Sequence, residues 1–216
     1  MRAVMYERER RSRAYYEGRA RRYDWANRIA ALLRGTSATR ERRKAVRRLH
    51  LKPGDRVLEV SVGTGTNLSL IAPRIGDAGR VVGLDISRGM LGVCVRKMEE
   101  KGVAGELVEG EAAHLPFAEG AFDAVLHHGG IAEFGDRGGA IAEMYRVVKR
   151  GGRVVVCDVG VPEDGRVSLV NRLLLRFQPE YDQPPPMDLV PGEAEDVSVR
   201  WYFRGAWYMI AFAKPE

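Results

Sequence analysis

The sequence contains only two cysteines, Cys94 and Cys157, and no apolar run of the roughly 20 residues that a membrane-spanning helix needs. The two cysteines have the spacing of neither a metal site nor a redox motif, so both are expected to be buried free thiols. Residues 1–13 are rich in arginine without an apolar core, which excludes a secretory signal at this position. The chain also has no internal repeat and no low-complexity tract. These absences favour a cytoplasmic protein.

The composition is that of an ordinary globular protein, but its charge is uneven. The 216 residues suffice for one domain with a sizeable core, and 45% are hydrophobic and 30% charged. Residues 1–50 hold 16 Lys and Arg against 5 Asp and Glu, whereas the remainder holds 19 against 24. Such asymmetry fits either an arm for an anionic partner or a solvated helical face. The arginine clusters alternate with acidic and apolar residues, which favours the solvated face.

The most informative segment is a short apolar run that leads into a glycine turn. Residues 57–60 read Val-Leu-Glu-Val, and the turn after them contains Gly63 and Gly65. Asp85 ends a second apolar run, twenty-two residues after Gly63. Glycines allow a backbone to approach a ligand closely, and a carboxylate can accept hydrogen bonds from both ribose hydroxyls. The layout predicts a βαβ unit that binds a nucleoside.

The same residues distinguish between nucleoside ligands. The dinucleotide fingerprint needs a third glycine, but Thr66-Asn67-Leu68 follows Gly65 here. Glu59 lies just before the turn, where an acid would repel a pyrophosphate and suit an ammonium group. A ligand with a ribose, an amino acid end and no phosphate therefore fits better than NAD. S-adenosylmethionine is such a ligand, and we expect it as the cofactor.

Five segments, in the right order, resemble the motifs of class I S-adenosylmethionine-dependent methyltransferases. The resemblance implies an α/β fold with a Rossmann-like, doubly wound, seven-stranded sheet. The sheet should be mostly parallel with an antiparallel last strand, and an N-terminal helical lid should cover it. The five segments are residues 57–65, 81–87, 110–117, 122–126 and 146–153.

Within this family, the chain is most similar to a small-molecule group that includes the quinone-biosynthesis C-methyltransferases. Residues 23–27, Tyr-Asp-Trp-Ala-Asn, resemble the tyrosine–aspartate entry of these enzymes. Ser61 stands where the first glycine is usual, and Glu111 stands where the adenine-pocket loop usually has Asp. Residues 36–40 lack the histidine and tryptophan of the quinone enzymes. The resemblance therefore does not extend to a quinone acceptor.

The pattern along the chain predicts alternating strands and helices, which imply a parallel sheet with right-handed crossovers. We divide the chain into a helical cover, residues 1–50, and a methyltransferase domain, residues 51–216. Residues 159–196 break the alternation, and the prolines at 184–186 indicate a linker or a lid edge. Helices are expected at 5–34, from 37 or 39 to 49, 66–75, 87–101, 138–149 and 169–177. Strands are expected at 56–60, 80–84, 105–109, 122–127, 153–158, and in a hairpin at 197–203 and 206–212.

Open α/β sheets bind ligands beyond the carboxyl ends of their strands. Asp85 is expected to bind the ribose, with a helix cap at Ser87 as the alternative. Met90 is expected either to pack on the adenine or to serve the core. By resemblance, Tyr23 should contact the methionine end of the cofactor. The expected cofactor-binding residues are Tyr23, Glu59, Ser61, Gly63, Gly65, Asn67, Asp85, Ile86, Met90, Glu111, Ala112 and His127.

His127 and His128 close the predicted fourth strand and are the candidate catalytic residues. A base with a pKa near 7 helps when the methyl acceptor must lose a proton. Successive strand residues point to opposite faces, so at most one of the two rings should face the ligand. The alternative for either is a histidine that shapes the turn at residues 129–130. Adjacent histidines lack the usual spacing of zinc ligands, and we expect no metal.

The sequence therefore predicts an enzyme that transfers the methyl group of S-adenosylmethionine to an O, N or C atom of a small-molecule acceptor. Three alternatives stay open. RNA methylation would explain the basic residues 1–50, but the chain lacks an aromatic stacking platform. Methylation of a phospholipid or quinone at a membrane surface needs a basic amphipathic helix, for which residues 5–34 are a moderate candidate. Ser61 and Glu111 motivate a non-catalytic cofactor-binding protein. Oligomerisation is left open.

Overall fold

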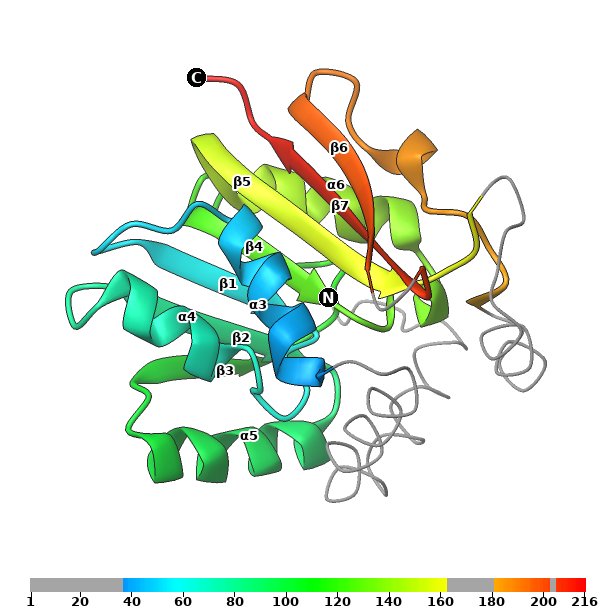
Figure 1. Ribbon diagram of the computed structural model, residues 1–216. Helices are drawn as coiled ribbons and strands as arrows, with labels where there is room; N and C mark the ends of the chain where they lie inside the picture. The colour runs from blue at the N-terminus through cyan, green and yellow to red at the C-terminus, as the bar shows by residue number, and fades with distance from the viewer. Residues whose placement is uncertain (1–36, 163–180, 203–204) are drawn as a thin grey trace.

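The structure is a computed structural model, and it describes residues 37–162, 181–202 and 205–216. A seven-stranded sheet forms its centre, in the order β3-β2-β1-β4-β5-β7-β6 (Figure 1). Strands β1 to β5 pair in parallel, whereas β7 is antiparallel to both β5 and β6. The strands are β1 (Arg56–Val60), β2 (Arg80–Asp85), β3 (Gly105–Glu109), β4 (Phe122–His128), β5 (Val148–Val159), β6 (Glu195–Tyr202) and β7 (Trp207–Ala213).

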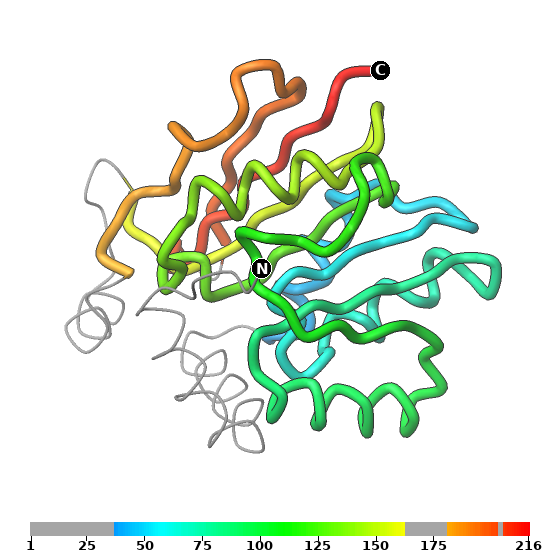
Figure 2. Tube along the Cα trace, turned by 180° about the vertical axis from the view of Figure 1, so that it is seen from behind, coloured from blue at the N-terminus to red at the C-terminus, as the bar shows by residue number. Residues whose placement is uncertain are grey.

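Helices cover both faces of this sheet. Side chains of α3, α4 and α5 contribute to the core on one face, and α6 contributes to the core on the other. Figure 2 shows α6 from behind, where it crosses in front of the strands at the β5–β7 side. The helices are α3 (Ala38–Arg48), α4 (Leu68–Ile75), α5 (Arg88–Lys101), α6 (Arg137–Val147) and the short 3-10 helices η1 (Ile131–Glu133) and η3 (Met187–Leu189).

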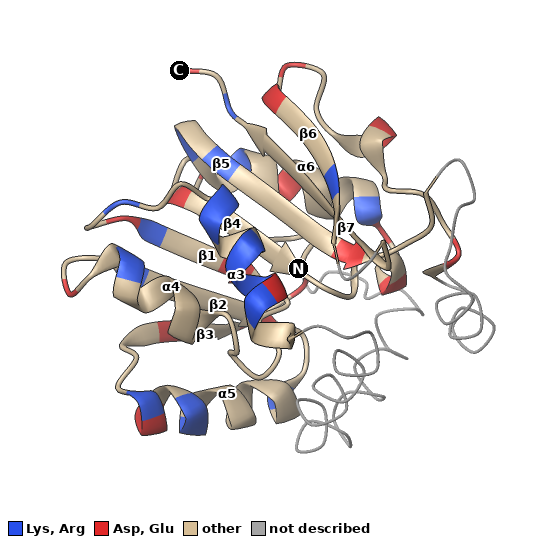
Figure 3. Ribbon diagram, viewed as in Figure 1, with Lys and Arg blue, Asp and Glu red and all other residues tan. Residues whose placement is uncertain are grey.

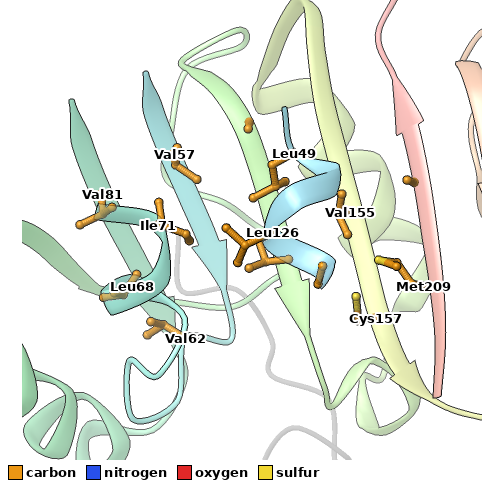
Figure 4. Close-up of a cluster of buried hydrophobic side chains, with 14 of the residues drawn as sticks. Leu49, Val57, Val62, Leu68, Ile71, Val81, Leu126, Val155, Cys157 and Met209 are labelled. Carbon is orange, nitrogen blue, oxygen red and sulfur yellow. The ribbon is translucent and has the colours of Figure 1, made fainter. Parts of the chain in front are cut away.

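The central strands are buried on both faces, which explains their nearly continuous apolar sequences. On the face shown in Figure 4, Val57 of β1, Leu126 of β4 and Val155 of β5 lie in one cluster with Leu49 and Ile71. Their neighbours along the same strands point to the opposite face, into the cluster that α6 covers. Alternate residues therefore fill two cores, and this fixes the register of each strand.

The predicted α/β fold is confirmed, including its mostly parallel sheet and the antiparallel last strand. The predicted helical lid before residue 37 and the predicted helix at 169–177 lie outside the described residues. The domain division at residue 50 stays a prediction. One observation bears on it: Ala45 and Val46 of α3 are fully buried in the same core as the sheet.

Two predicted boundaries were wrong at the join of α6 and β5. The helix ends at Val147 rather than at residue 149, and the strand begins at Val148 rather than at 153. Val148 pairs with Phe122, and the next pair joins Ala124 to Arg153. The intervening residues bulge from the ladder. The glycine at position 151 predicted a loop before the strand, and Gly151 does adopt a left-handed backbone, with φ 71°.

The proline segment lies against the α6 side of the sheet. Val161 donates a backbone hydrogen bond to the carbonyl of Gln183 at 3.0 Å. Met187 and Leu189 of η3, just after the prolines, pack on the cluster that includes α6. Of the two predicted roles, the described residues 181–190 fit an edge that covers the fold. Among the described residues, none of the helices has the length and apolar character needed to cross a membrane.

Candidate cofactor and active site

The turn after β1 has the left-handed backbone that glycines favour. Gly63 has φ 56° and Gly65 has φ 74°, and Ser61 adopts φ 56° in the position of the family's first glycine. Around Gly63 an added Cβ would meet nothing within 4 Å, but at Gly65 it would collide with the thiol of Cys94 on α5. Gly63 therefore supplies conformation, whereas Gly65 also allows α5 to pack closely against the turn.

Asp85 connects this turn to the start of α5. Its Oδ2 accepts a hydrogen bond from the backbone N–H of Gly63 at 2.8 Å, and its Oδ1 accepts one from Ser87 at 2.9 Å. The helix itself is capped by Ser87, whose hydroxyl accepts from the N–H of Met90 at 3.2 Å. Each carboxylate oxygen can accept more than one hydrogen bond, so Asp85 can still receive ribose hydroxyls.

Glu59 is a buried carboxyl that lines the larger of the two cavities described below. Its Oε1 accepts a 2.5 Å hydrogen bond from Asn67, whose own Oδ1 accepts from Arg42 at 3.1 Å. Among the described residues, Oε2 of Glu59 has no hydrogen-bond partner. Burial raises the pKa of Glu59 to about 8, although the Asn67 hydrogen bond and the Arg42 charge oppose the shift. An unpartnered buried carboxyl is costly unless a ligand satisfies it, and an ammonium group would do so.

Two adjoining cavities lie beyond the carboxyl ends of β1, β2 and β4, and they share Ser61, Ile86 and Phe134. The larger cavity encloses about 630 Å³, including space that is open to solvent. It is lined by Arg42, Glu59, Ser61, Val62, Gly63, Thr64, Thr66, Asp85, Ile86, Met90, His128, Gly129, Gly130 and Phe134. The smaller cavity is lined by Ser61, Leu84, Ile86, Gly110, Glu111, Ala112, Ala113, Glu133, Phe134 and Asp136.

Most of the expected cofactor-binding residues lie around these two cavities. Gly65 and Asn67 line neither of them and instead hold the turn, through α5 and Glu59 respectively. Tyr23 lies outside the described residues. Of the expected residues, Glu59, Ser61, Gly63, Asp85, Ile86 and Met90 line the larger cavity, and Ser61, Ile86, Glu111 and Ala112 line the smaller one.

Glu111 has the position of the expected acid of the adenine loop. Its Oε2 lies 3.5 Å from Nδ1 of His114, which is largely exposed. Leu84 and Ile86 provide apolar surface on the other side of the same cavity. The smaller cavity therefore has one apolar wall and one acidic edge, a combination that suits a flat base with an exocyclic amino group.

The two histidines at the end of β4 differ in environment. Nδ1 of His127 lies 3.1 Å from the carbonyl of Val60, so this nitrogen must carry the proton and donate. The fully buried ring packs against Phe134, with 5.2 Å between centroids, and does not line either cavity. Burial lowers the pKa of His127 to about 4, so its imidazole is neutral at physiological pH. This environment supports a structural role for His127.

His128 lines the larger cavity, whereas His127 lines neither of the two. Its Nε2 lies 3.3 Å from the hydroxyl of Tyr202, and its ring lies 5.0 Å from that of Trp207. Burial, together with the charge of Arg42, holds the pKa of His128 well below its ordinary value. Of the two histidines, His128 is therefore the one whose neutral imidazole lies in the cavity wall. The alternation of strand residues predicts that at most one of the two rings faces the ligand.

Asp158, at the end of β5, holds the turn that follows His128. Its Oδ2 accepts from the N–H of Ala132 at 3.0 Å, and its Oδ1 accepts from Val159 at 2.8 Å. Gly129 and Gly130 have φ 93° and 101°, which lets the chain reverse direction over the cavity. Burial raises the pKa of Asp158 to about 7, against the lowering effect of these backbone donors. Asp158 was not among the predicted site residues, although it is an acid at the carboxyl end of the apolar run 154–157.

Thr64, Thr66 and Phe134 also line the cavity, within segments that the sequence places at the ligand crevice, whereas Arg42 is a cavity residue that the sequence did not indicate. The threonines lie within the glycine turn, and Lys97 of α5 donates to the hydroxyl of Thr64 at 2.9 Å. Arg42 comes from α3, and its proximity to the cavity depends on how that helix packs. The sequence offers one signal for Arg42: the apolar residues Ala45 and Val46 follow it at the three- and four-residue spacing of a helix that packs on the core.

The model of the ubiE/COQ5 methyltransferase family matches residues 4–170 of the chain. A demethylmenaquinone methyltransferase of Thermus thermophilus is 39% identical over 154 residues, which cover 71% of this chain and 68% of that protein. A protein of the same name from Mycolicibacterium vanbaalenii is 34% identical over 183 residues, covering 85% of this chain and 70% of that protein. The chain spans about two thirds of the length of its curated relatives.

Among solved structures, the fold is similar to phosphoethanolamine N-methyltransferase 2 of Haemonchus contortus in complex with phosphomonomethylethanolamine and S-adenosylhomocysteine. The TM-score is 0.68 at 19% sequence identity, and the match covers 82% of this chain and 53% of that one. At this identity the likeness concerns the fold alone. The match to the family model, the identity to the curated relatives and the cavity geometry agree. The chain belongs to the ubiE/COQ5 methyltransferase family and is an S-adenosylmethionine-dependent methyltransferase.

Proposed function

We propose that the small-molecule acceptor of this enzyme is a quinone-type ring that binds beside His128. Curated relatives that are 39% and 34% identical to this chain are named demethylmenaquinone methyltransferases, which supports an acceptor of this kind. The larger cavity adds a physical argument, because the aromatic side chains His128 and Phe134 both line it. Flat rings pack well on such faces. The proposal rests on one observation: the residues expected to bind the cofactor and two aromatic side chains line the same cavity.

The residues around the two cavities fit S-adenosylmethionine part by part. Asp85 would accept from the ribose hydroxyls, and the smaller cavity at Glu111 would take the adenine. Glu59 would bind the ammonium group, since its Oε2 has no hydrogen-bond partner among the described residues. Arg42 lines the same cavity as Glu59 and would attract the carboxylate of the methionine end. Each charge of the ligand thus has an opposite charge nearby.

When bound, the cofactor supplies a methyl group that is already a strong electrophile on a sulfonium. The protein therefore needs mainly to orient the acceptor, which can contribute roughly 7–11 kcal/mol. The turn at Gly129–Gly130 and the Phe134 side chain form part of the cavity wall. Of the two histidines that end β4, His128 is the one in the cavity wall, and we assign it the role of taking a proton from the acceptor.

An activity assay tests the proposal directly. Purified protein should methylate a reduced demethylated quinone in detergent micelles, and mass spectrometry should detect a product heavier by one methylene. Asp85→Asn should weaken cofactor binding in calorimetry by roughly 1.5–3 kcal/mol, because hydrogen bonds to the charged oxygens are lost. Asp77→Asn, on the exposed turn before the amino end of β2 and so at the far end of the strand from Asp85, should bind as the wild type does. Methylation of other acceptors but no quinone would contradict the proposal.

A second observation favours presentation of the acceptor at an anionic surface. Helix α3 exposes Arg40, Arg43, Lys44 and Arg47, whose three- and four-residue spacing places them on one side of the helix. The ribbon of α3 is largely blue, the colour of Lys and Arg, in Figure 3. Basic residues near an anionic membrane contribute about 1 kcal/mol each. Co-sedimentation with vesicles that contain anionic lipid should therefore exceed that with neutral vesicles and fall as salt is added. Equal binding to both vesicles would remove this part of the proposal.

A further inference from the structure

The smaller cavity is bordered by a loop that has no helix or strand between residues 110 and 121. The loop begins at the cavity, where the N–H of Gly110 donates to the carbonyl of Asp85 at 3.1 Å. Residues 111–113 follow and line the cavity. A segment without ladder hydrogen bonds keeps a defined shape only where other groups hold its backbone. The place of the Glu111 carboxyl group therefore depends on what holds the remainder of the loop.

Two charged side chains on α6 hold the middle of this loop. Nε of Arg146 donates to Oε1 of Glu143 at 2.6 Å, and Nη2 donates to Oε2 at 2.8 Å. Oε2 of Glu143 also accepts from the backbone N–H of Leu115 at 2.8 Å. The guanidinium donates in addition to the carbonyl of Leu115 at 3.2 Å and to that of Phe117 at 2.9 Å. Three backbone groups of the loop thus bind to one ion pair.

The ion pair is a defined geometric element. The hydrogen bonds from Arg146 hold the pKa of Glu143 below its ordinary value, against the effect of burial. The carboxylate is therefore ionised at neutral pH. A guanidinium that faces a carboxylate with two parallel hydrogen bonds has its plane and direction fixed. The remaining N–H groups of Arg146 consequently point to definite places, which are the two loop carbonyls.

Apolar contacts alone do not explain the shape of the loop. The side chain of Leu115 is buried in the core that α6 covers, and the ring of Phe117 lies 5.0 Å from that of Phe122. Apolar contacts are non-directional, so they attach the loop to the sheet without fixing the course of its backbone. Hydrogen bonds to Glu143 and Arg146 are directional and supply what the apolar contacts lack.

A tight turn connects the held residues to the cavity. The N–H of His114 donates to the carbonyl of Glu111 at 3.1 Å, and the next residue is Leu115, which contacts the ion pair. One end of this turn is thus held by α6, and the other end carries the acid at the cavity. Glu143 and Arg146 are not among the described residues that line the two cavities, so their effect on a ligand would pass through the loop.

We propose that Arg146 and Glu143 are positioning residues for the adenine end of the cofactor. They hold residues 115–117, and the turn then places the Glu111 carboxylate where it can accept from the exocyclic amino group of the base. The inference rests on the proposed function for the place of the adenine. A loop that already has its bound shape loses less conformational freedom when the ligand binds. The pair therefore acts on cofactor affinity and base selectivity, and not on the methyl-transfer step.

The first test compares two ligands that differ at the base. Arg146→Lys keeps the charge but lacks the planar set of donors. Its dissociation constant for S-adenosylhomocysteine should rise roughly tenfold, about the equivalent of one hydrogen bond. S-inosylhomocysteine has an oxygen in place of the amino group, and its affinity should fall less. A general loss of stability would weaken both ligands by the same factor, so an unchanged ratio in calorimetry would overturn the inference.

Kinetics provide a second reading of the same variant. The KM for S-adenosylmethionine should rise with the dissociation constant, whereas kcat and the acceptor KM should stay within about twofold. Lys149→Gln is the matched control, because it removes a similar ion pair, to Asp123 at the end of β4 away from the cavities. Its cofactor KM should stay within about twofold of the wild type. A fall in kcat at constant cofactor KM in Arg146→Lys would contradict the proposed role.

Glu143→Gln tests whether the two residues act as a unit. The amide cannot accept from both Arg146 and Leu115 as the carboxylate does. The amide hydrogen of Leu115 should therefore exchange faster with solvent in either single variant, in the absence of any ligand. The double variant should lose little more cofactor affinity than each single one, because either change already breaks the pair. Additive losses, or an unchanged exchange rate, would refute the joint role.

These tests also separate the inference from the proposed function. A wild-type protein that does not prefer S-adenosylhomocysteine over S-inosylhomocysteine refutes the proposed place of the adenine, and the inference with it. A wild-type protein with this preference and an Arg146→Lys variant that retains it refute the positioning role alone. Reduced preference in the variant, together with no methylation of a quinone, supports the positioning role and refutes the proposed acceptor. Thermal unfolding establishes that each variant is folded.

Discussion

At the residue scale, two carboxyl groups on neighbouring strands do different work in the same cavity. Asp85 receives two backbone N–H groups, which stabilise its ionised form. Glu59 receives one side-chain hydrogen bond in a fully buried place, and burial raises its pKa to about 8. In the free protein Glu59 is therefore largely protonated at neutral pH. An ammonium group would favour the ionised form, so ligand binding and proton release should be coupled.

Glu59→Gln tests this coupling. Wild-type protein should release close to one proton when S-adenosylmethionine binds at neutral pH, because the ammonium group draws the pKa of Glu59 downward. The release should diminish as the pH rises through about 8, where Glu59 is already ionised. Calorimetry in buffers with different ionisation enthalpies measures the proton count. The glutamine variant should release none and should bind more weakly.

The same pKa predicts a pH dependence of stability with a definite sign. Glu59 binds its proton more tightly in the folded state than at its ordinary value of 4.5. Its contribution to the free energy of unfolding is therefore complete below pH 4.5 and is lost as the pH rises to about 8. Urea unfolding of the wild type relative to Glu59→Gln should show this decline. A difference that grows with pH would contradict the assignment.

At the element scale, the turn after β1 depends on its fit against α5. Gly65 is the point of closest approach, since any side chain there would collide with Cys94. Lys97, one turn further along α5, donates to Thr64 and so holds the other side of the turn. The distance between helix and turn determines where the N–H of Gly63 meets Asp85. Packing at Gly65 is thereby connected to the shape of the cofactor site.

Gly65→Ala should lower the free energy of unfolding by about 2 kcal/mol or more, from the collision and the left-handed backbone together. Gly63→Ala has space for the methyl group and should cost only the backbone strain, about 1 kcal/mol. The double change Gly65→Ala with Cys94→Ala should recover part of the loss, with a coupling of roughly 1 kcal/mol. Strictly additive losses in urea unfolding would show that Cys94 is not the obstacle.

Sequence reasoning succeeded for elements whose signals are local. The apolar runs of β1 and β2 and the glycine turn are adjacent in the chain, and they predicted both the strands and the ligand edge. The beginning of β5 was missed because Val148 is a strand residue only through its pairing with Phe122. Gly65 and Asn67 were identified from the motif, but the motif does not distinguish residues that line a cavity from residues that support its lining.

At the scale of the whole molecule, the site is assembled from distant parts of the chain. Arg42 comes from α3, Asp158 from β5 and Tyr202 from β6, and each approaches the carboxyl end of β1 or β4 only in the folded protein. None of these three residues carries a local signal that separates it from an ordinary surface arginine, turn acid or core tyrosine. Their roles depend on strand order and helix packing, which are properties of the complete fold.

Arg42 provides a test at this scale. Arg42→Ala removes a hydrogen bond to Asn67 and the positive charge next to Glu59, so cofactor affinity should fall roughly tenfold or more. Arg43→Ala removes an exposed charge from the adjacent position of the same helix and should leave the affinity within about twofold. Calorimetric titration of both variants decides the matter. Equal effects would indicate a general electrostatic role for α3 instead of a specific one for Arg42.

The register of β4 has a consequence for how such an enzyme can change. This strand is fixed on both sides, by β1 and by β5, and its last two residues are histidines whose rings have different surroundings, Phe134 for His127 and Tyr202 with Trp207 for His128. A shift of the strand register by one residue would place the imidazole of His127 at the wall of the larger cavity and remove His128 from it. An insertion or deletion within this strand would therefore exchange the surroundings of the two histidines, whereas a substitution at either position would leave the register of the sheet intact.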